Sequence, residues 1–163
     1  MSLLIKNGTV VTSEDEVKAD VYVEGETIKA IGENLDVKAD EVIDAKGKFI
    51  LPGGVDQHVH FSFTYKGSKV RGFETSNAAL VGGTTTLIEF VNQEPGKGLI
   101  ESIDSYRKTD VDGIAMTDYC FHSVMTDPRD EVIMEIPKLA EAGYPTMKLF
   151  MAYKGMFFHA DDD

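Results

Sequence analysis

The amino-acid sequence predicts an α/β fold in which a small antiparallel β unit precedes a parallel sheet with helices on its faces. Two styles of sequence meet near Leu51: short β-type runs separated by turns come before it, and apolar runs that alternate with helical patterns follow it. Strand and helix patterns in alternation are typical of parallel βα units. We therefore place the β unit at residues 1–51 and the βα units at residues 52–163.

The first 51 residues contain three dipeptides ending in glycine that are typical of tight turns. Asn7-Gly8 lies within LLIKNGTVV, Glu24-Gly25 within VYVEGETIKAI, and Lys46-Gly47 within EVIDAKGKFIL. Each dipeptide separates two apolar or β-branched runs, which is the pattern of a β-hairpin. No stretch has the periodicity of a long helix, so we expect antiparallel strands here.

The remaining residues contain four strand-like runs, VDQHVHF, TTTLIEFV, IAMTDYCFHSV and TMKLFMAY. Between them lie three helical patterns: GFETSNAALVGG, LIESIDSYRK, and a region that opens at Asp127-Pro128 and is interrupted at Pro137. Such a parallel sheet can belong either to an open doubly wound fold or to a closed eight-stranded barrel. The turn HFSFTYKGS lacks a glycine-rich phosphate loop, which favours the barrel, and four strands are half of one.

Composition excludes several classes of function. The 163 residues carry a formal net charge of −12, which disfavours nucleic acid and anionic membranes as partners. No run approaches the roughly 20 apolar residues of a membrane-spanning helix, and Lys6 and Asn7 interrupt the start too early for a signal peptide. The single cysteine, Cys120, lies in an apolar run and is interpreted as a buried strand residue. We expect a cytoplasmic protein.

His58 and His60 form a His-x-His pair at the end of the first strand of the parallel sheet. Alternate residues of a strand point to the same face, so two imidazoles there can share one metal ion. The alternative is a pair of solvent-facing or hydrogen-bonded histidines. The preceding LPGGVD, and the fact that half of the chain's four histidines are in this pair, favour a metal site.

Lys148 lies in the middle of the apolar run TMKLFMAY. Burying an ammonium group is costly, so a buried lysine has a lowered pKa and is often the neutral amine. A neutral amine can react with carbon dioxide to give a carbamate, an anionic ligand able to bridge two metal ions. A lysine that extends its amine to solvent from a strand end is the alternative.

Three motifs occur in order: PGGVD at residues 52–56 followed by His58-x-His60, GGTTT at 82–86, and KLFMAYK at 148–154. In this order they resemble the dihydropyrimidinases and D-hydantoinases of the amidohydrolase superfamily, over essentially the whole chain. KLFMAYK is the most specific of the three. The resemblance implies the first half of a metal-dependent-hydrolase (β/α)8 barrel of the TIM type, preceded by part of a small antiparallel β-sandwich.

The resemblance also implies an activity, the hydrolysis of cyclic amides of dihydropyrimidines or hydantoins to N-carbamoyl amino acids by a hydroxide bound to two metal ions. His58 and His60 would bind one divalent ion, most simply zinc, and Lys148, carboxylated, would bridge it to a second. Tyr153 would hydrogen-bond the substrate carbonyl oxygen. The substrate pocket would be lined by Phe63, Tyr65, Phe150 and Phe157.

The family completes its metal site with two histidines and an aspartate from later strands, so we expect this chain alone to be inactive. The full-length protein would be a homotetramer acting on a small cyclic ureide. Two alternatives remain, a non-catalytic dihydropyrimidinase-like scaffold and an allantoinase-type hydrolase. Among other candidates, Asp56 would support the metal ligands, His122 would not be a ligand, and His159 would lie in a solvated acidic loop.

Overall fold

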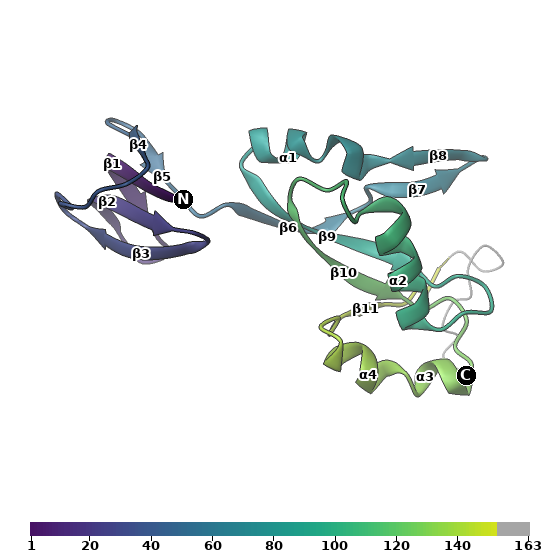
Figure 1. Cartoon of the computed structure of the whole chain (residues 1–163). Helices are drawn as coiled ribbons and strands as arrows, with labels where there is room; N and C mark the ends of the chain where they lie inside the picture. Colours follow the sequence, from purple (N-terminus) through teal and green to yellow (C-terminus); the bar gives the residue numbers. More distant parts are fainter. Residues whose placement is uncertain (153–163) are drawn as a thin grey trace. The chain divides into compact units, whose positions relative to one another are not determined.

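The structure is a computed structural model that describes residues 1–152. The chain folds as two units, Met1–Pro52 and Gly53–Asp163, each with its own sheet. Figure 1 traces them along the sequence, from purple strands in the first unit to green and yellow elements in the second.

The first unit is a five-stranded sheet of mixed direction. Its strands are β1 (Ser2–Val11), β2 (Glu16–Glu24), β3 (Thr27–Gly32), β4 (Glu41–Asp44) and β5 (Phe49–Ile50). β1, β2 and β3 form an antiparallel meander, whereas β4 and β5 both pair with β1 in parallel. The expectation of a purely antiparallel unit is therefore wrong for the last two strands.

The three glycine dipeptides of this unit have three different roles. Glu24-Gly25 makes the expected hairpin between β2 and β3, with Gly25 at a φ of 61°. Asn7-Gly8 does not turn the chain, because β1 continues through it and the pairing with β2 shifts there as a β-bulge. Lys46-Gly47 joins two strands that both run parallel to β1, so it is a turn but not a hairpin.

The second unit contains a four-stranded parallel sheet, and all four expected runs contribute a strand to it. The strands are β6 (Gly54–Val59), β9 (Thr84–Asn92), β10 (Asp118–Val124) and β11 (Met147–Lys148). Their spatial order, β11-β10-β9-β6, follows the sequence without a crossover. A doubly wound sheet would reverse its order at the first strand, and the described strands show no such reversal at β6.

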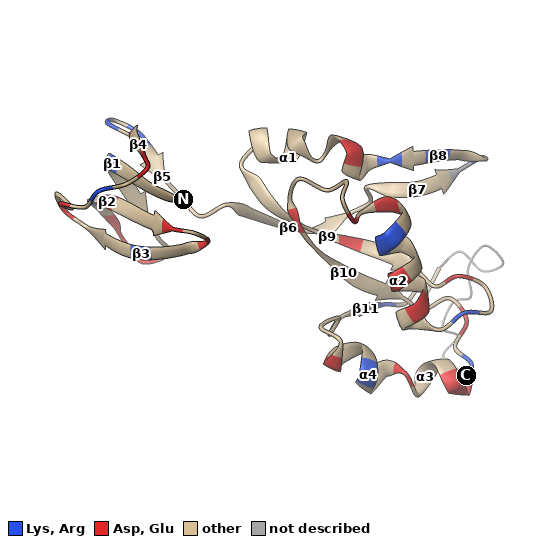
Figure 2. Cartoon of the chain, in the orientation of Figure 1, with Lys and Arg blue, Asp and Glu red and all other residues tan. Residues whose placement is uncertain are grey.

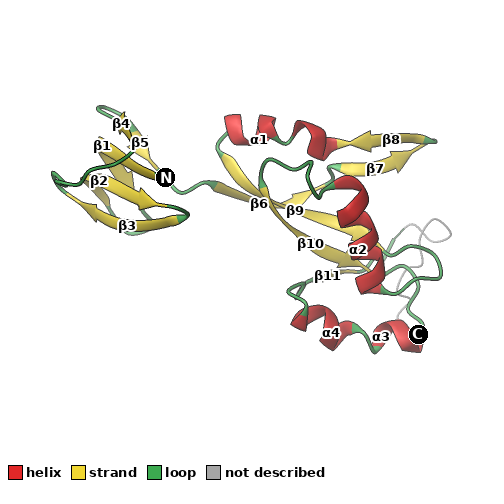
Figure 3. Ribbon diagram, in the orientation of Figure 1, coloured by secondary structure: helices red, strands yellow, loops and turns green. Residues whose placement is uncertain are grey.

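Helices cover one face of this sheet, as Figure 3 shows in red. They are η1 (Gly72–Thr75), α1 (Asn77–Val81), α2 (Leu99–Asp110), α3 (Asp130–Ile133) and α4 (Ile136–Glu141). The buried core joins the helices to β9 and β10 through Phe73, Leu87, Val91, Leu99, Ile103, Phe121, Val132 and Leu139. The apolar spacing of Leu99 and Ile103 thus marks the buried face of α2.

Pro137 does not interrupt a helix, contrary to expectation. The break falls at Met134 and Glu135, and Pro137 lies in the first turn of α4. A proline is tolerated there because the first N–H groups of a helix have no partner within the helix.

A further hairpin was not predicted. It consists of β7 (Ser62–Tyr65) and β8 (Ser68–Arg71), which pair antiparallel directly after β6. Lys66 and Gly67 turn the chain with φ values of 48° and 81°. Two consecutive positive φ angles are those of a type I′ turn, and the Lys-Gly dipeptide was the available signal.

Acidic and basic side chains are interspersed along the described elements of each unit, as Figure 2 shows. Within residues 1–152, no helix combines the length and the apolar character needed to cross a bilayer.

Candidate functional site

The candidate site lies at the carboxyl end of β6, on the face of the sheet opposite the helices. Val59 is buried, whereas His58 and His60, on either side of it, point the other way. Their ring centroids are 5.5 Å apart. The strand alternation therefore brings the two imidazoles together, with Asp56 Oδ1 accepting a 3.1 Å hydrogen bond from the backbone N–H of His58.

Phe90 is the shared neighbour of the candidate ligands, and sequence reasoning missed it. Its ring centroid lies 4.5 Å from that of His58 and 5.2 Å from that of His60. The Nζ of Lys148 lies 4.3 Å from the same centroid, and His122 stacks on the ring at 4.6 Å. Phe90 follows the buried Glu89 in β9, so alternation directs it to the site face.

Lys148 is half-buried, and its surroundings differ from the expected apolar strand. β11 has two residues and, among residues 1–152, pairs only with β10, while Leu149 and Met151 are 52% and 85% exposed. An edge strand with a single neighbour buries less of its side chains than a central one. The amine also contacts Phe150, at 4.9 Å from the ring centroid; such aromatic faces stabilise an ammonium group.

Glu89 is a second residue that sequence reasoning missed. Its side chain is 1% exposed, and it accepts hydrogen bonds from the backbone N–H groups of Phe61, Ser62 and Phe90. Burial raises the pKa of this carboxyl to about 6, although the backbone N–H groups oppose the shift. The available signal was an acidic residue inside the apolar run LIEFV.

Burial and neighbouring positive charges favour the neutral imidazole of His60. Partial burial lowers the pKa of His60, and the positive charges of Lys148 and His58 add to the effect. The carboxylate of Glu89, 3.9 Å from His60 Nδ1, acts in the opposite direction, because a nearby negative charge favours the imidazolium. A neutral imidazole has a free lone pair, which is the form that binds metal ions.

A cavity of about 760 Å³ opens beside these residues. Phe63 and Phe150, two of the predicted pocket residues, line it together with His60 and Lys148. Its other walls come from Ser62, Thr64, Lys69, Glu89, Phe90, Asn92, Tyr106, Asp110 and Val124. Tyr65 lies in β7, but its side chain is not described. Tyr153, Phe157 and His159 lie outside the described residues.

The remaining candidates occupy other positions. His122 uses both ring nitrogens, Nδ1 toward the hydroxyl of Thr146 and Nε2 toward the carbonyl oxygen of Gln57 at 3.0 Å. Cys120 lies in strand β10 as expected, but it is half-buried and not buried.

The described residues do not by themselves form a metal site. No group of three or more His, Cys, Asp or Glu side chains within residues 1–152 is arranged to hold an ion. Zinc sites need three or four protein ligands. Two imidazoles and one nearby lysine amine fit such a site only under two conditions. The lysine must be converted to a group whose oxygen atoms can bind metal, and other residues must supply further ligands.

The chain is thus an α/β protein with a parallel sheet, in which His60 and Lys148 line one cavity at the carboxyl end of the strands. It is a homologue of the N-terminal part of the D-hydantoinases and dihydropyrimidinases, which are longer hydrolases of cyclic amides. No protein-family model matches the chain.

The similarity extends over nearly the whole chain but only part of each relative. The chain is 41% identical to a D-hydantoinase of Geobacillus stearothermophilus, covering 99% of this chain and 35% of the relative. It is 39% identical to a dihydropyrimidinase of Dictyostelium discoideum, covering 99% and 33%. The crystal structure of dihydropyrimidinase from Brevibacillus agri superposes with a TM-score of 0.91 at 38% identity, covering 99% and 35%. The chain thus spans about a third of the length of these relatives.

Proposed function

We propose that this chain forms part of an enzyme that hydrolyses the cyclic amide bond of dihydropyrimidines or hydantoins to N-carbamoyl amino acids. The observation that carries the proposal is the gathering of His58, His60 and Lys148 around Phe90, beside a cavity of about 760 Å³. The homology to D-hydantoinases and dihydropyrimidinases supports it. We further propose that the complete fold is an eight-stranded barrel, in which strand ends of this kind carry the active site.

His58 and His60 would hold one divalent ion, for which we propose zinc, and Lys148 as a carbamate would bridge it to a second. The 5.5 Å between the two imidazole centroids supports a shared ion. When bound, two such ions lower the pKa of a water molecule and polarise the substrate carbonyl. The later strands of the whole protein would supply the remaining ligands.

The side chains of this chain would bind and orient the substrate. Phe63 and Phe150 would pack against the substrate ring and exclude water from the cavity. Tyr153, by its place in the KLFMAYK motif, would donate a hydrogen bond to the carbonyl oxygen as negative charge develops there. We propose that the proton for the leaving ring nitrogen comes from a residue of a later strand, and that the whole protein is a cytoplasmic homotetramer.

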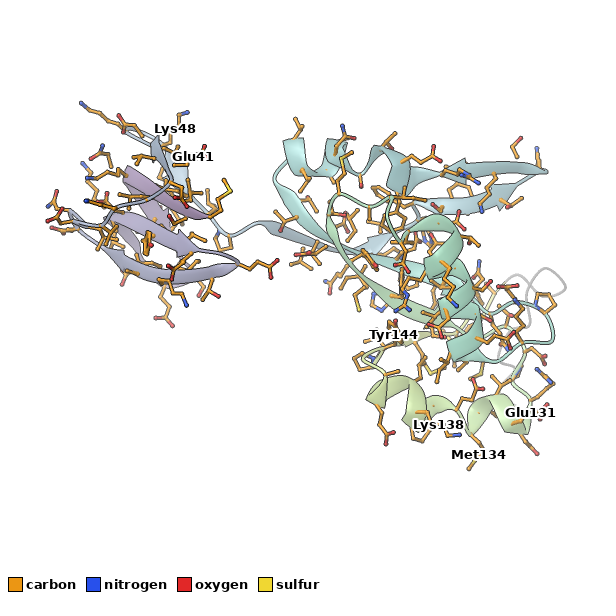
Figure 4. All side chains as sticks on the ribbon, in the orientation of Figure 1. Glu41, Lys48, Glu131, Met134, Lys138 and Tyr144 are labelled. Carbon is orange, nitrogen blue, oxygen red and sulfur yellow. The ribbon has the colours of Figure 1, made fainter. Side chains whose placement is uncertain are left out.

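The test uses the full-length protein with dihydrouracil, hydantoin and allantoin as substrates. His58→Ala and His60→Ala are expected to lose bound zinc and to lower kcat/KM for the preferred ring by at least about 100-fold. Lys138→Ala is the control, because Lys138 lies on α4 on the outside of the second unit, as Figure 4 shows, and should leave zinc content and turnover unchanged.

The alternatives give different results in the same assays. A non-catalytic scaffold would turn over none of the three rings, and an allantoinase would prefer allantoin. Wild-type zinc content and turnover in both histidine variants would contradict the proposal.

A further inference from the structure

Glu89 is a carboxylate with almost no solvent exposure, placed under the turn that follows β6. Its Oε2 accepts hydrogen bonds from the N–H groups of Phe61 and Ser62, the two residues directly after His60, and Oε1 accepts one from Phe90 at 2.9 Å. Three converging donors fit an ionised carboxylate, which accepts hydrogen bonds and donates none. The arrangement fixes the backbone on both sides of the site, at the end of β6 and at Phe90.

The same carboxylate faces the ring of His60. Glu89 Oε1 lies 3.9 Å from His60 Nδ1, and the His60 side chain is 53% exposed, which leaves it room to rotate. If these two atoms move about 1 Å closer together, they are at an ordinary hydrogen-bond distance. Histidines that bind a metal through one ring nitrogen commonly donate the other N–H to a carboxylate, which fixes the tautomer and the ring orientation.

We propose that Glu89 is a positioning residue of the metal site, which accepts the Nδ1–H of His60 and thereby presents Nε2 to the metal ion. The inference rests on the proposed function, since it requires that the site binds metal. A merely structural Glu89 would hold the turn after β6 through its backbone hydrogen bonds, would accept no hydrogen bond from His60 Nδ1, and would not decide which ring nitrogen of His60 binds the metal. The two roles therefore differ in a measurable quantity.

The experiment measures the zinc affinity of the full-length protein by competition with a chelator, and the thermal unfolding of the metal-free protein by circular dichroism. Glu89→Gln keeps the size of the side chain and removes its charge. We expect zinc to bind about 10- to 100-fold more weakly in a variant that is still folded at the temperature of the measurement. Glu94→Gln is the matched control, because Glu94 follows the same strand but pairs with Lys97 at 2.8 Å, away from the cavity.

A zinc affinity of Glu89→Gln within twofold of wild type would overturn the proposal. A crystal structure of the zinc-loaded wild-type protein separates the positioning role from the structural one, and it decides alone if that variant does not fold. His60 Nε2 on the metal with Nδ1 within hydrogen-bond distance of Glu89 supports the proposal, and Nδ1 on the metal overturns it. A wild-type protein that binds no zinc and hydrolyses none of the rings overturns the proposed function as well, whereas an active wild type with an unaffected Glu89→Gln overturns this inference alone.

Discussion

The amine of Lys148 lies over the ring of Phe90, 4.3 Å from its centroid. An aromatic face attracts an ammonium group but accepts no strong hydrogen bond from it. Because His58 and His60 pack on the same ring, Phe90 gathers groups from β6, β9 and β11 into one cluster. The amine is thereby held beside the histidine pair, at the edge of a cavity that a small molecule can enter.

Replacing Lys148 by alanine is expected to abolish hydrolysis in the full-length protein and to lower bound metal from two ions toward one or none. The reason is that the variant removes the bridging oxygen ligands that the carbamate would supply. A short carboxylic acid such as acetate or propionate, added to Lys148→Ala, should restore part of both by occupying the vacated space. Metal analysis and turnover of dihydrouracil check this. Lys138→Ala serves again as the control, and full activity and metal content in Lys148→Ala would contradict the carbamate role.

Glu89 should make the metal-free protein less stable as pH rises. Its folded pKa, about 6, lies above the unfolded value of 4.5. The group therefore contributes stability that is fully present below pH 4.5 and is lost as pH rises through 6. The loss amounts to about 2 kcal/mol of unfolding free energy, from 1.36 kcal/mol per pKa unit.

Urea unfolding of metal-free wild type and Glu89→Gln at several pH values from 4 to 8 isolates this effect. The difference in unfolding free energy between the two proteins should fall between pH 4.5 and about 6 and then level off. A difference that is constant with pH would show that the carboxyl titrates alike in the folded and unfolded chains.

Gln93 is a buried amide that joins two loops at the carboxyl ends of β9 and β10. Its Oε1 accepts from the N–H groups of Thr126 and Asp127 at 3.1 and 3.0 Å, and its Nε2 donates to the carbonyl of Lys97 at 2.9 Å. Gln93→Ala leaves these groups without partners, and we expect a loss of about 3 kcal/mol of unfolding free energy. The control is Gln57→Ala, at an exposed glutamine, which should change the unfolding free energy by less than about 0.5 kcal/mol. Equal effects of the two variants would refute the role of Gln93.

Glu135, in the break between α3 and α4, supplies the N-terminal cap of α2. The N-cap residue, Gly98, has no side chain, and the N–H of Leu99 donates instead to Glu135 Oε2 at 2.7 Å. Glu135→Ala should therefore cost about 1 kcal/mol of unfolding free energy. Glu141→Ala removes an exposed carboxylate at the end of α4 and should cost nothing, since acidic side chains are unfavourable there. Thermal unfolding of both variants checks this. An unchanged unfolding free energy in Glu135→Ala would show that Glu135 does not cap α2.

Much of the fold was predictable because hydrophobic periodicity is a local property. The four runs of the second unit became parallel strands in sequence order, and Leu99 and Ile103 became the buried face of α2. The three Xaa-Gly turn signals of the first unit had different outcomes because strand pairing is not local. A Cβ at Gly8 would collide with the side chain of Ile50, so the packing of β5 on β1 decides the conformation there.

The sequence by itself determined that His58 and His60 share a face, because the two-residue period of a strand requires it. It also identified Lys148 as a candidate, because a charged side chain inside an apolar run is costly to bury unless it is paired. Only the tertiary structure decided that Phe90 lies between these groups and that Glu89 reaches the turn beyond His60. Both residues act across strands that are distant in sequence, and which side chains meet there depends on strand order and register, which no local pattern encodes.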